Sequence, residues 1–223
     1  MSRQLRLEFG RRTSLSRADF AIGATNRQAL SAIEAWPNWT GGCLAVYGPS
    51  EVGKTHLAHI WTNLAAASVL NRRQIDATSL HGPALLIEDV DQGIDSETLF
   101  HLINMAGRGD ISLLLTARTA PLGWQASLPD LRSRLNAMPV AEIQEPDDTV
   151  LEAILRKHFT ELSLRPPDDL IPYLLRRMER TAPAARDIVM ALDELADLSQ
   201  RPISRLLAKQ ILEKDAENID LFE

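Results

Sequence analysis

The sequence predicts an α/β protein: a core with a mostly parallel sheet, followed by a small all-helical domain. Short apolar runs alternate with helical patterns up to Pro146, as is typical of strand–helix repeats in parallel sheets. After Pro146 four helical patterns follow one another without an intervening strand. A glycine-rich segment at 48–55 stands between the first strand and the next helix, which indicates a core that holds phosphate groups.

Apolar periodicity places the elements of the core. Helices are expected at 26–35, with Asn26 near its start, at 55–70, at 96–107, capped by Ser96, and at 129–138. Buried strands are expected at 43–48, 84–89, 110–118 and 140–144. Beyond the core, helices are expected at 149–162, 168–179, 184–199 and 204–217. This pattern divides the chain into a flexible tail (1–18), a nucleotide-binding core (19–146) and a helical lid (147–223).

Composition narrows the protein class. The 223 residues are 45% hydrophobic and 24% charged, which suits one large domain or a core with a small second domain. A net charge of −6 argues against a broad phosphate-contacting surface, although it does not exclude a local basic patch. The single cysteine, Cys43, is expected to be a small buried residue in a reducing compartment. No signal-peptide pattern or membrane-spanning run is present, so we expect a cytoplasmic protein.

The segment GPSEVGKTH at 48–56 contains G-x-x-x-x-G-K-T after a strand and before a helix, the context that a phosphate loop requires. Its glycines let backbone N–H groups turn toward the phosphates of ATP or ADP, and the helix N-terminus adds partial positive charge. We expect Lys54 to reach the β- and γ-phosphate oxygens and the Thr55 hydroxyl to hold Mg²⁺. The other residues expected at the nucleotide are Gly48, Pro49, Ser50, Glu51, Val52, Gly53 and His56.

An acidic pair, Glu88 and Asp89, follows the apolar run 84–87. One carboxylate would bind Mg²⁺ and the other would orient the attacking water. The alternative is that both merely cap a strand. Asp91 is expected to be a solvated loop residue.

Three further polar residues occur where such a site would use them. Thr116 ends the third strand and is a candidate ligand of the γ-phosphate or the attacking water, although threonine is also simply common in strands. Arg134 suits phosphate recognition at a subunit interface. The alternative is that Arg134 forms only a surface salt bridge. The neighbouring Arg132 is the residue that could be mistaken for it. Arg186 opens a late helix that would fold over the site, unless it is an ordinary exposed arginine.

The segments GPSEVGKTHLAH, LLIEDVD, LLLTAR, LPDLRSRL and AARDIVMALDEL occur in that order. This series resembles the AAA+ domain of the DnaA family of replication initiators, and more closely its shortened, regulatory Hda members, over nearly the whole chain. The resemblance implies that Lys54 and Thr55 are a Walker A pair and that Glu88 and Asp89 are a Walker B pair. It also implies that Thr116 is a first sensor, Arg134 an arginine finger acting in trans, and Arg186 a second sensor.

Two further segments match the family. FAIGATNRQAL, which contains Ile22, is similar to the lead-in that packs near the adenine. QLRLEF at 4–9 resembles the sliding-clamp-binding peptide Q-x-x-L-x-F, with Gln4, Leu5, Leu7 and Phe9 as its contacts. The alternative is a frayed terminus or an edge strand, which could also pair the tails of a homodimer.

The resemblance implies a negative regulator of replication initiation. It would dock on the DNA-loaded clamp of DNA polymerase III, touch DNA only through that clamp, and stimulate hydrolysis of DnaA-bound ATP. With no further DNA-reading domain after the lid-like helices, the chain is not expected to be an initiator itself. The alternatives are a helicase-loader ATPase of the DnaC type and a purely bridging adaptor.

Three departures from the family bear on these expectations. Glu88 stands where the initiator usually has Asp, and Arg118 and Thr119 replace its Ser-Asp-Arg. The stretch at 72–83 is short, which predicts that the core lacks a helix there. Intrinsic ATP hydrolysis is therefore expected to be weak.

Overall fold

A five-stranded sheet forms the centre of the first part of the chain, and the computed structural model describes residues 15–75 and 81–220. The strand order is β2-β3-β4-β1-β5, and all neighbouring strands run parallel. The strands are β1 (Cys43–Tyr47), β2 (Ser68–Leu70), β3 (Ala84–Ile87), β4 (Ser112–Ala117) and β5 (Val140–Glu142). β1 lies between β4 and β5, so the loop that leaves β1 has a strand on each side of it.

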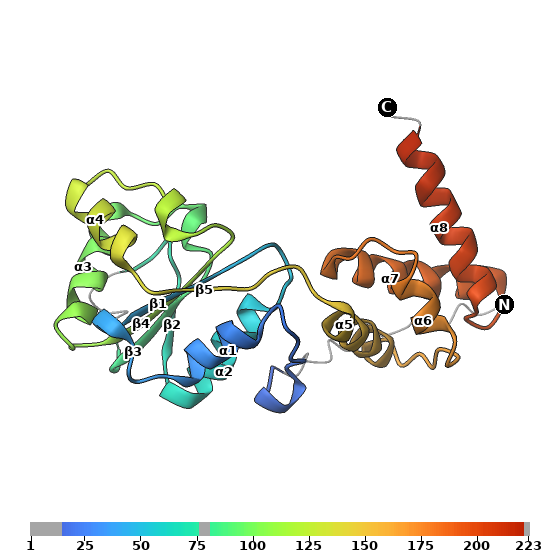
Figure 1. Ribbon diagram of the computed structural model, residues 1–223, viewed down its shortest axis with the longest axis horizontal. Helices are drawn as coiled ribbons and strands as arrows, with labels where there is room; N and C mark the ends of the chain where they lie inside the picture. Colours follow the sequence, from blue (N-terminus) through green and yellow to red (C-terminus); the bar gives the residue numbers. More distant parts are fainter. Residues whose placement is uncertain (1–14, 76–80, 221–223) are drawn as a thin grey trace.

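Helices cover both faces of this sheet. They are α1 (Arg27–Glu34), α2 (Lys54–Ala65), α3 (Ser96–Gly107) and α4 (Pro129–Ala137), with short 3₁₀ turns at Arg17–Asp19, Thr40–Gly42, Val90–Gln92 and Pro121–Gly123. Figure 1 shows α1 and α2 on one side of the sheet, and α3 and α4 on the other. Successive residues of β1 alternate between the two cores: Cys43 and Ala45 face α3 and α4, whereas Leu44 and Val46 face α2. Burial of both faces explains why the strands are uniformly apolar.

Four helices complete the chain and form a core of their own. They are α5 (Asp148–Glu161), α6 (Leu170–Leu175), α7 (Ala182–Ser199) and α8 (Arg205–Asp220). Leu155, Phe159, Leu174 and Leu192 are buried among them. In Figure 1 this group lies beyond one end of the sheet, with α5 and α7 nearest to it. None of the helices in the described ranges is long and apolar enough to cross a membrane.

Asp147 ties the helical group to the core. Its Oδ1 accepts a hydrogen bond from Val150 N at 2.9 Å and so caps α5, and its Oδ2 accepts from Ala24 N at 2.7 Å. A Cβ on Gly23 would lie 2.4 Å from Asp147 Oδ2, so only glycine allows this approach. Hydrogen bonds to the carboxylate lower the pKa of Asp147 below 3.8, because they favour its charged form. The bond from the Val150 N–H has the largest effect, and bonds from N–H groups of the lead-in add to it.

The structure corrects four sequence expectations. The helix expected at 55–70 ends at Ala65, because Ala66 is left-handed with φ 48°, and 68–70 form β2 instead. Asp95, not Ser96, caps α3, since its Oδ2 accepts from Thr98 N at 2.8 Å. The helix expected at 168–179 is confined to α6. Asp91 was expected to be a solvated loop residue, but its carboxylate accepts a hydrogen bond from Arg118 N.

The remaining strands and helices match the sequence expectations. The described residues between β2 and β3, namely 71–75 and 81–83, include no helix, as the short sequence there predicted. Asn26 stands at the start of α1, where its side chain accepts from Gly23 N and donates to Ala21 O.

Replacing Asp147 with Ala should lower the free energy of unfolding at pH 7 by about 1–2 kcal/mol, because the α5 cap is lost. The carboxylate has a lowered pKa in the folded protein, so its contribution is present above its ordinary pKa of 3.8 and disappears as the pH falls through the lower folded value. The difference from wild type should therefore shrink in urea unfolding below about pH 4. A difference that persists unchanged at pH 2.5 would contradict this account.

Candidate nucleotide-binding site

The loop at 48–53 joins β1 to α2 and fits closely against the neighbouring strand ends. Gly48 N donates to Ala117 O at 3.3 Å, and a Cβ on Gly48 would lie only 2.1 Å from the carbonyl oxygen of Ile143. Gly53 has φ 107° and precedes the first residue of α2. Glycine is therefore required where the loop begins and where it enters the helix. The free N–H groups at the start of α2 form the electropositive end on which a phosphate can bind.

Lys54 is turned into this loop. Its side chain is buried, and Nζ donates to Gly48 O at 2.8 Å and to Pro49 O. Burial lowers the pKa of Lys54, while the charge of Asp89 opposes this effect. The Lys54 ammonium group donates to two neutral carbonyls in a partly dry site, so an anionic partner would stabilise its charge further.

The acidic pair follows β3 at the same edge of the sheet. Asp89 adopts a left-handed backbone with φ 53°, and its N–H donates to the hydroxyl of Thr116 at 3.1 Å. Glu88 Oε1 is buried and, within the described residues, has no hydrogen-bond donor. Thr116 is 2% exposed and lies beside Val46 of β1, so β3, β4 and the phosphate loop meet here.

These residues fit Mg²⁺. The donorless buried oxygen of Glu88 is suited to a cation or to its bound water. In the part of the chain that the structure describes, no three His, Cys, Asp or Glu side chains cluster as a metal cage. Mg²⁺ usually takes one or two protein oxygens and completes its shell with phosphate and water. Thr55, Glu88 and Asp89 are the residues that would hold it, and the ion would neutralise phosphate charge there.

Asp91 was expected to be solvated, but it builds the turn after β4. Its Oδ2 accepts from Arg118 N at 2.9 Å and from Thr119 N at 3.2 Å. This turn places the exposed Arg118 side chain near Lys54, whose pKa it helps to lower. Sequence reasoning did not give Arg118 a role, although its position two residues after Thr116 was the available signal.

A cavity of about 580 Å³ lies between the lead-in segment, the phosphate loop and α5. Phe20, Val52, His56 and Ile154 are among its lining residues, so it is an apolar recess beside a phosphate loop, as a nucleoside requires. Ile22, expected near the adenine, is 38% exposed and is not part of the lining; Phe20 and Ala21 line the recess instead.

His56 supports the wall of this cavity. Its Nε2 donates to Ser16 O at 2.8 Å, and its ring meets Phe20 edge-on with centroids 5.1 Å apart. Burial lowers the pKa of His56, so the ring is neutral at pH 7. We therefore assign His56 to positioning the lead-in segment rather than to binding phosphate by charge.

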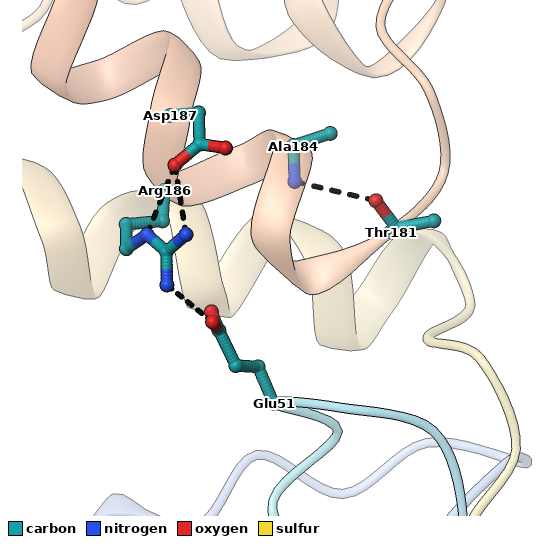
Figure 2. A network of polar contacts seen from close by, with 5 residues as sticks. All are labelled: Glu51, Thr181, Ala184, Arg186 and Asp187. Carbon is teal, nitrogen blue, oxygen red and sulfur yellow. Dashed lines mark hydrogen bonds and ion pairs between the residues drawn. The ribbon is translucent and has the colours of Figure 1, made fainter.

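Arg186 reaches the phosphate loop from α7. Figure 2 shows its guanidinium between Asp187 on the same helix and Glu51 in the loop. Nη1 pairs with Glu51 Oε1, and Nη2 lies 2.9 Å from Asp187 Oδ1. Hydrogen bonds to Asp187 and then Glu51 raise the pKa of Arg186 further, so it is always charged. The expected approach of this arginine to the loop is thus present, with Glu51 as its partner.

The two arginines of α4 differ in their contacts. Arg132 donates to Leu122 O at 2.8 Å and to Trp124 O at 2.5 Å, so it holds the preceding turn. Arg134 is exposed and makes no ion pair or hydrogen bond with any described residue. Its Nη1 would lie 3.9 Å from a Cβ on Gly107, at the end of α3.

Arg134 lies near the start of β1, at the opposite end of that strand from the chain's own phosphate loop. Burial raises the pKa of Cys43 to about 12, and the positive charge of Arg134 opposes that rise. Cys43 is the first residue of β1, whereas the loop follows the last residue of that strand. The buried thiol itself is protonated at neutral pH and is not a nucleophile.

The predicted clamp-peptide residues Gln4, Leu5, Leu7 and Phe9 lie outside the described residues.

No protein-family model matches the chain. The chain is 26% identical over 249 residues to the chromosomal replication initiator protein DnaA of Flavobacterium psychrophilum, an alignment that covers 97% of this chain and 52% of that protein. A DnaA from Clavibacter sepedonicus is 27% identical over 90% of this chain and 48% of its own length. The chain therefore spans about half the length of the curated relatives it matches.

Solved structures show the same architecture. Domain III of the Thermotoga maritima replication initiation protein DnaA superposes with a TM-score of 0.69 at 18% identity, covering 90% of this chain and 96% of that one. AMPPCP-bound DnaA from Aquifex aeolicus gives 0.64 at 19% identity, covering 95% and 72%. The RuvB branch migration motor of T. maritima gives 0.67 at 19%, covering 90% and 72%. The predicted fold class is confirmed: a parallel AAA+ P-loop core followed by helices, in a chain similar in sequence to DnaA.

The contrast between Arg132 and Arg134 predicts different effects on stability. Arg132→Ala should lower the free energy of unfolding by about 1–2 kcal/mol, because two carbonyls lose their donor. Arg134→Ala, the matched control on the same helix, should stay within about 0.5 kcal/mol of wild type. Urea unfolding followed by circular dichroism measures both values. Equal losses in the two variants would show that Arg134 also has a structural role.

Proposed function

We propose that this protein is a nucleotide-binding negative regulator of chromosomal replication initiation, which stimulates hydrolysis of DnaA-bound ATP. The observation that carries the proposal is the pairing of a phosphate-loop site with an exposed Arg134 that has no partner among the described residues, on another part of the core. Similarity in sequence to DnaA supports a role at initiation. Such a role would be cytoplasmic.

In this proposal the chain's own nucleotide is a structural ligand, not the main substrate. Lys54 and the N-terminus of α2 would hold its phosphates, and the cavity beside Phe20 would hold its base. Thr55, Glu88 and Asp89 would bind Mg²⁺, while Thr116 would contact the γ-phosphate or a water. Glu88 Oε1 has no hydrogen-bond donor among the described residues, and the chain's own hydrolysis is expected to be slow. The helical group from 147 onward would act as a lid over this site.

The catalytic contribution would be made in trans. Arg134 would enter the nucleotide site of DnaA, where its guanidinium stabilises negative charge that develops on the transferred phosphoryl group. Its lack of partners among the described residues leaves it available for such a contact. Arginine fingers of this kind contribute about a thousandfold or more to hydrolysis. Residues 4–9 would dock the protein on the DNA-loaded sliding clamp and bring it to DnaA.

Nucleotide binding is the first step to test. Lys54→Ala should weaken binding of ADP and ATP by at least about tenfold, because a charge-assisted phosphate contact is lost. Lys209→Ala is the charge-matched control, since Lys209 pairs with Glu213 on α8, outside the candidate site. Fluorescence titration with a labelled nucleotide measures both. Unchanged affinity in Lys54→Ala would favour the adaptor alternative, in which the phosphate loop is only structural.

The regulatory step is tested with radiolabelled ATP pre-bound to the cognate DnaA, in the presence of clamp loaded on DNA. The intact protein should accelerate hydrolysis, and Arg134→Ala should return the rate to background without loss of stability. A variant with Gln4, Leu5 and Phe9 changed to Ala should lose acceleration at low protein concentration, because docking on the clamp is lost. Full stimulation by Arg134→Ala would refute the finger. No stimulation by the intact protein, with ADP present, would favour the helicase-loader or adaptor alternatives.

A further inference from the structure

We propose that Glu51 sets the preference of this site between nucleoside triphosphates and diphosphates, by competing with the terminal phosphate for Arg186. The inference rests on the proposed nucleotide binding. It assigns a specificity role to a side chain of the phosphate loop, whose other members are expected to act through their backbone N–H groups or, at Lys54, through the ammonium.

The position of Glu51 in the loop is unusual for its residue type. Its φ is 63°, in the left-handed region that favours glycine, although the loop already uses glycine at 48 and 53. The carboxylate leaves the loop toward α7, where it pairs with Arg186, 135 residues later in the chain (Figure 2). Strained backbone of this kind persists where the surrounding structure holds it, and here the carboxylate of the strained residue pairs with the helical group.

The charges around Arg186 make this contact a competitor of phosphate. One guanidinium faces two carboxylates, Glu51 and Asp187, so the local net charge is negative before any ligand binds. Asp187 belongs to the same helix and can stay in place when a ligand arrives. Glu51 belongs to the loop that would hold the phosphates, so Glu51 and a bound phosphate would compete for the Nη1 donor of Arg186.

The number of phosphates decides how strongly Glu51 opposes binding. A diphosphate can be neutralised by Lys54 and the N-terminus of α2, and the Glu51–Arg186 pair can remain intact. A triphosphate carries an additional charge that needs a further cation, and Arg186 is the arginine that the helical group holds against the loop. Recruiting it would leave the carboxylate of Glu51 unpaired beside the more negatively charged ligand.

The expected effect is modest because the pair is partly solvated. The Arg186 and Glu51 side chains are 40% and 38% exposed, so the ion pair itself is weak and screened. Removing the carboxylate also removes its direct repulsion of phosphate. We expect Glu51→Gln to raise the affinity for a triphosphate about three- to tenfold and the affinity for a diphosphate less than about twofold.

The test measures binding of ADP and of the non-hydrolysable AMPPCP, each with Mg²⁺, to the full chain by isothermal titration calorimetry. Glu152→Gln is the matched control: it removes the same charge from an exposed ion pair with Arg156, 2.7 Å away on α5. A second pair of variants places Glu51→Gln on an Arg186→Ala background. There the change in the ratio of the two affinities should be smaller, because no guanidinium is left to release and only the direct repulsion between Glu51 and phosphate is removed.

The outcomes separate this inference from the proposed function. A selective gain for AMPPCP in Glu51→Gln, absent in Glu152→Gln and smaller in the Arg186→Ala background, supports the competition. Equal changes for both nucleotides, or none, overturn it while leaving nucleotide binding intact. If neither the unaltered chain nor any variant binds either nucleotide, the proposed nucleotide site fails as well. Should Glu51→Gln not fold, Glu51→Gly removes the same carboxylate at a backbone angle that glycine favours.

Discussion

β1 pairs in parallel with β4 on one side and with β5 on the other, and the candidate site depends on this arrangement. Because all strands point the same way, the segments that follow them gather at one edge of the sheet. The phosphate loop follows β1, Glu88 and Asp89 follow β3, and Thr116 stands near the end of β4. Groups separated by more than sixty residues are thereby brought to the same edge of the sheet by backbone pairing. The hydrogen bond from Asp89 N to Thr116 fixes the last of these relations.

The loop and the helical group are joined by charge rather than by a shared apolar core. The buried residues of the helical group form one cluster, and those of the sheet and its helices form two others. The polar ties between them include Asp147, which holds Ala24 N, and Glu51, which pairs with Arg186. Exposed ion pairs are weak and rearrange readily, whereas apolar cores do not. A ligand that competes for Arg186 can therefore change how α7 sits on the loop at little energetic cost.

The sequence predicted the parts of the fold that local patterns determine. β1, β3 and β4 each contain at least four apolar residues, and burial on both faces makes such runs recognisable. β2 was missed because it has three residues, only Leu70 is buried, and it follows the alanine-rich end of a helix. The cap of α3 was misplaced by one residue because Asp95 and Ser96 are both good capping residues.

The candidate site was predictable to the extent that its chemistry lies in short motifs. The phosphate loop and the acidic pair could be found because each is contiguous and follows a strand. The contacts of Glu51 and Asp91 could not, since their partners are 135 and 27 residues away and no periodicity connects them. A carboxylate next to a phosphate loop has no fixed meaning in a sequence, because its effect depends on the cation that faces it.

The choice between Arg132 and Arg134 shows the same limit on a smaller scale. Both are arginines of one helix, two residues apart, and their residue type and spacing give no reason to prefer either. Their surroundings differ: Arg132 satisfies the carbonyls of Leu122 and Trp124, whereas Arg134 has no partner among the described residues. Folding already uses the first guanidinium as a structural donor. An exposed guanidinium with no partner among the described residues, at the end of β1 opposite the chain's own phosphate loop, is the one that our proposal assigns to a second protein.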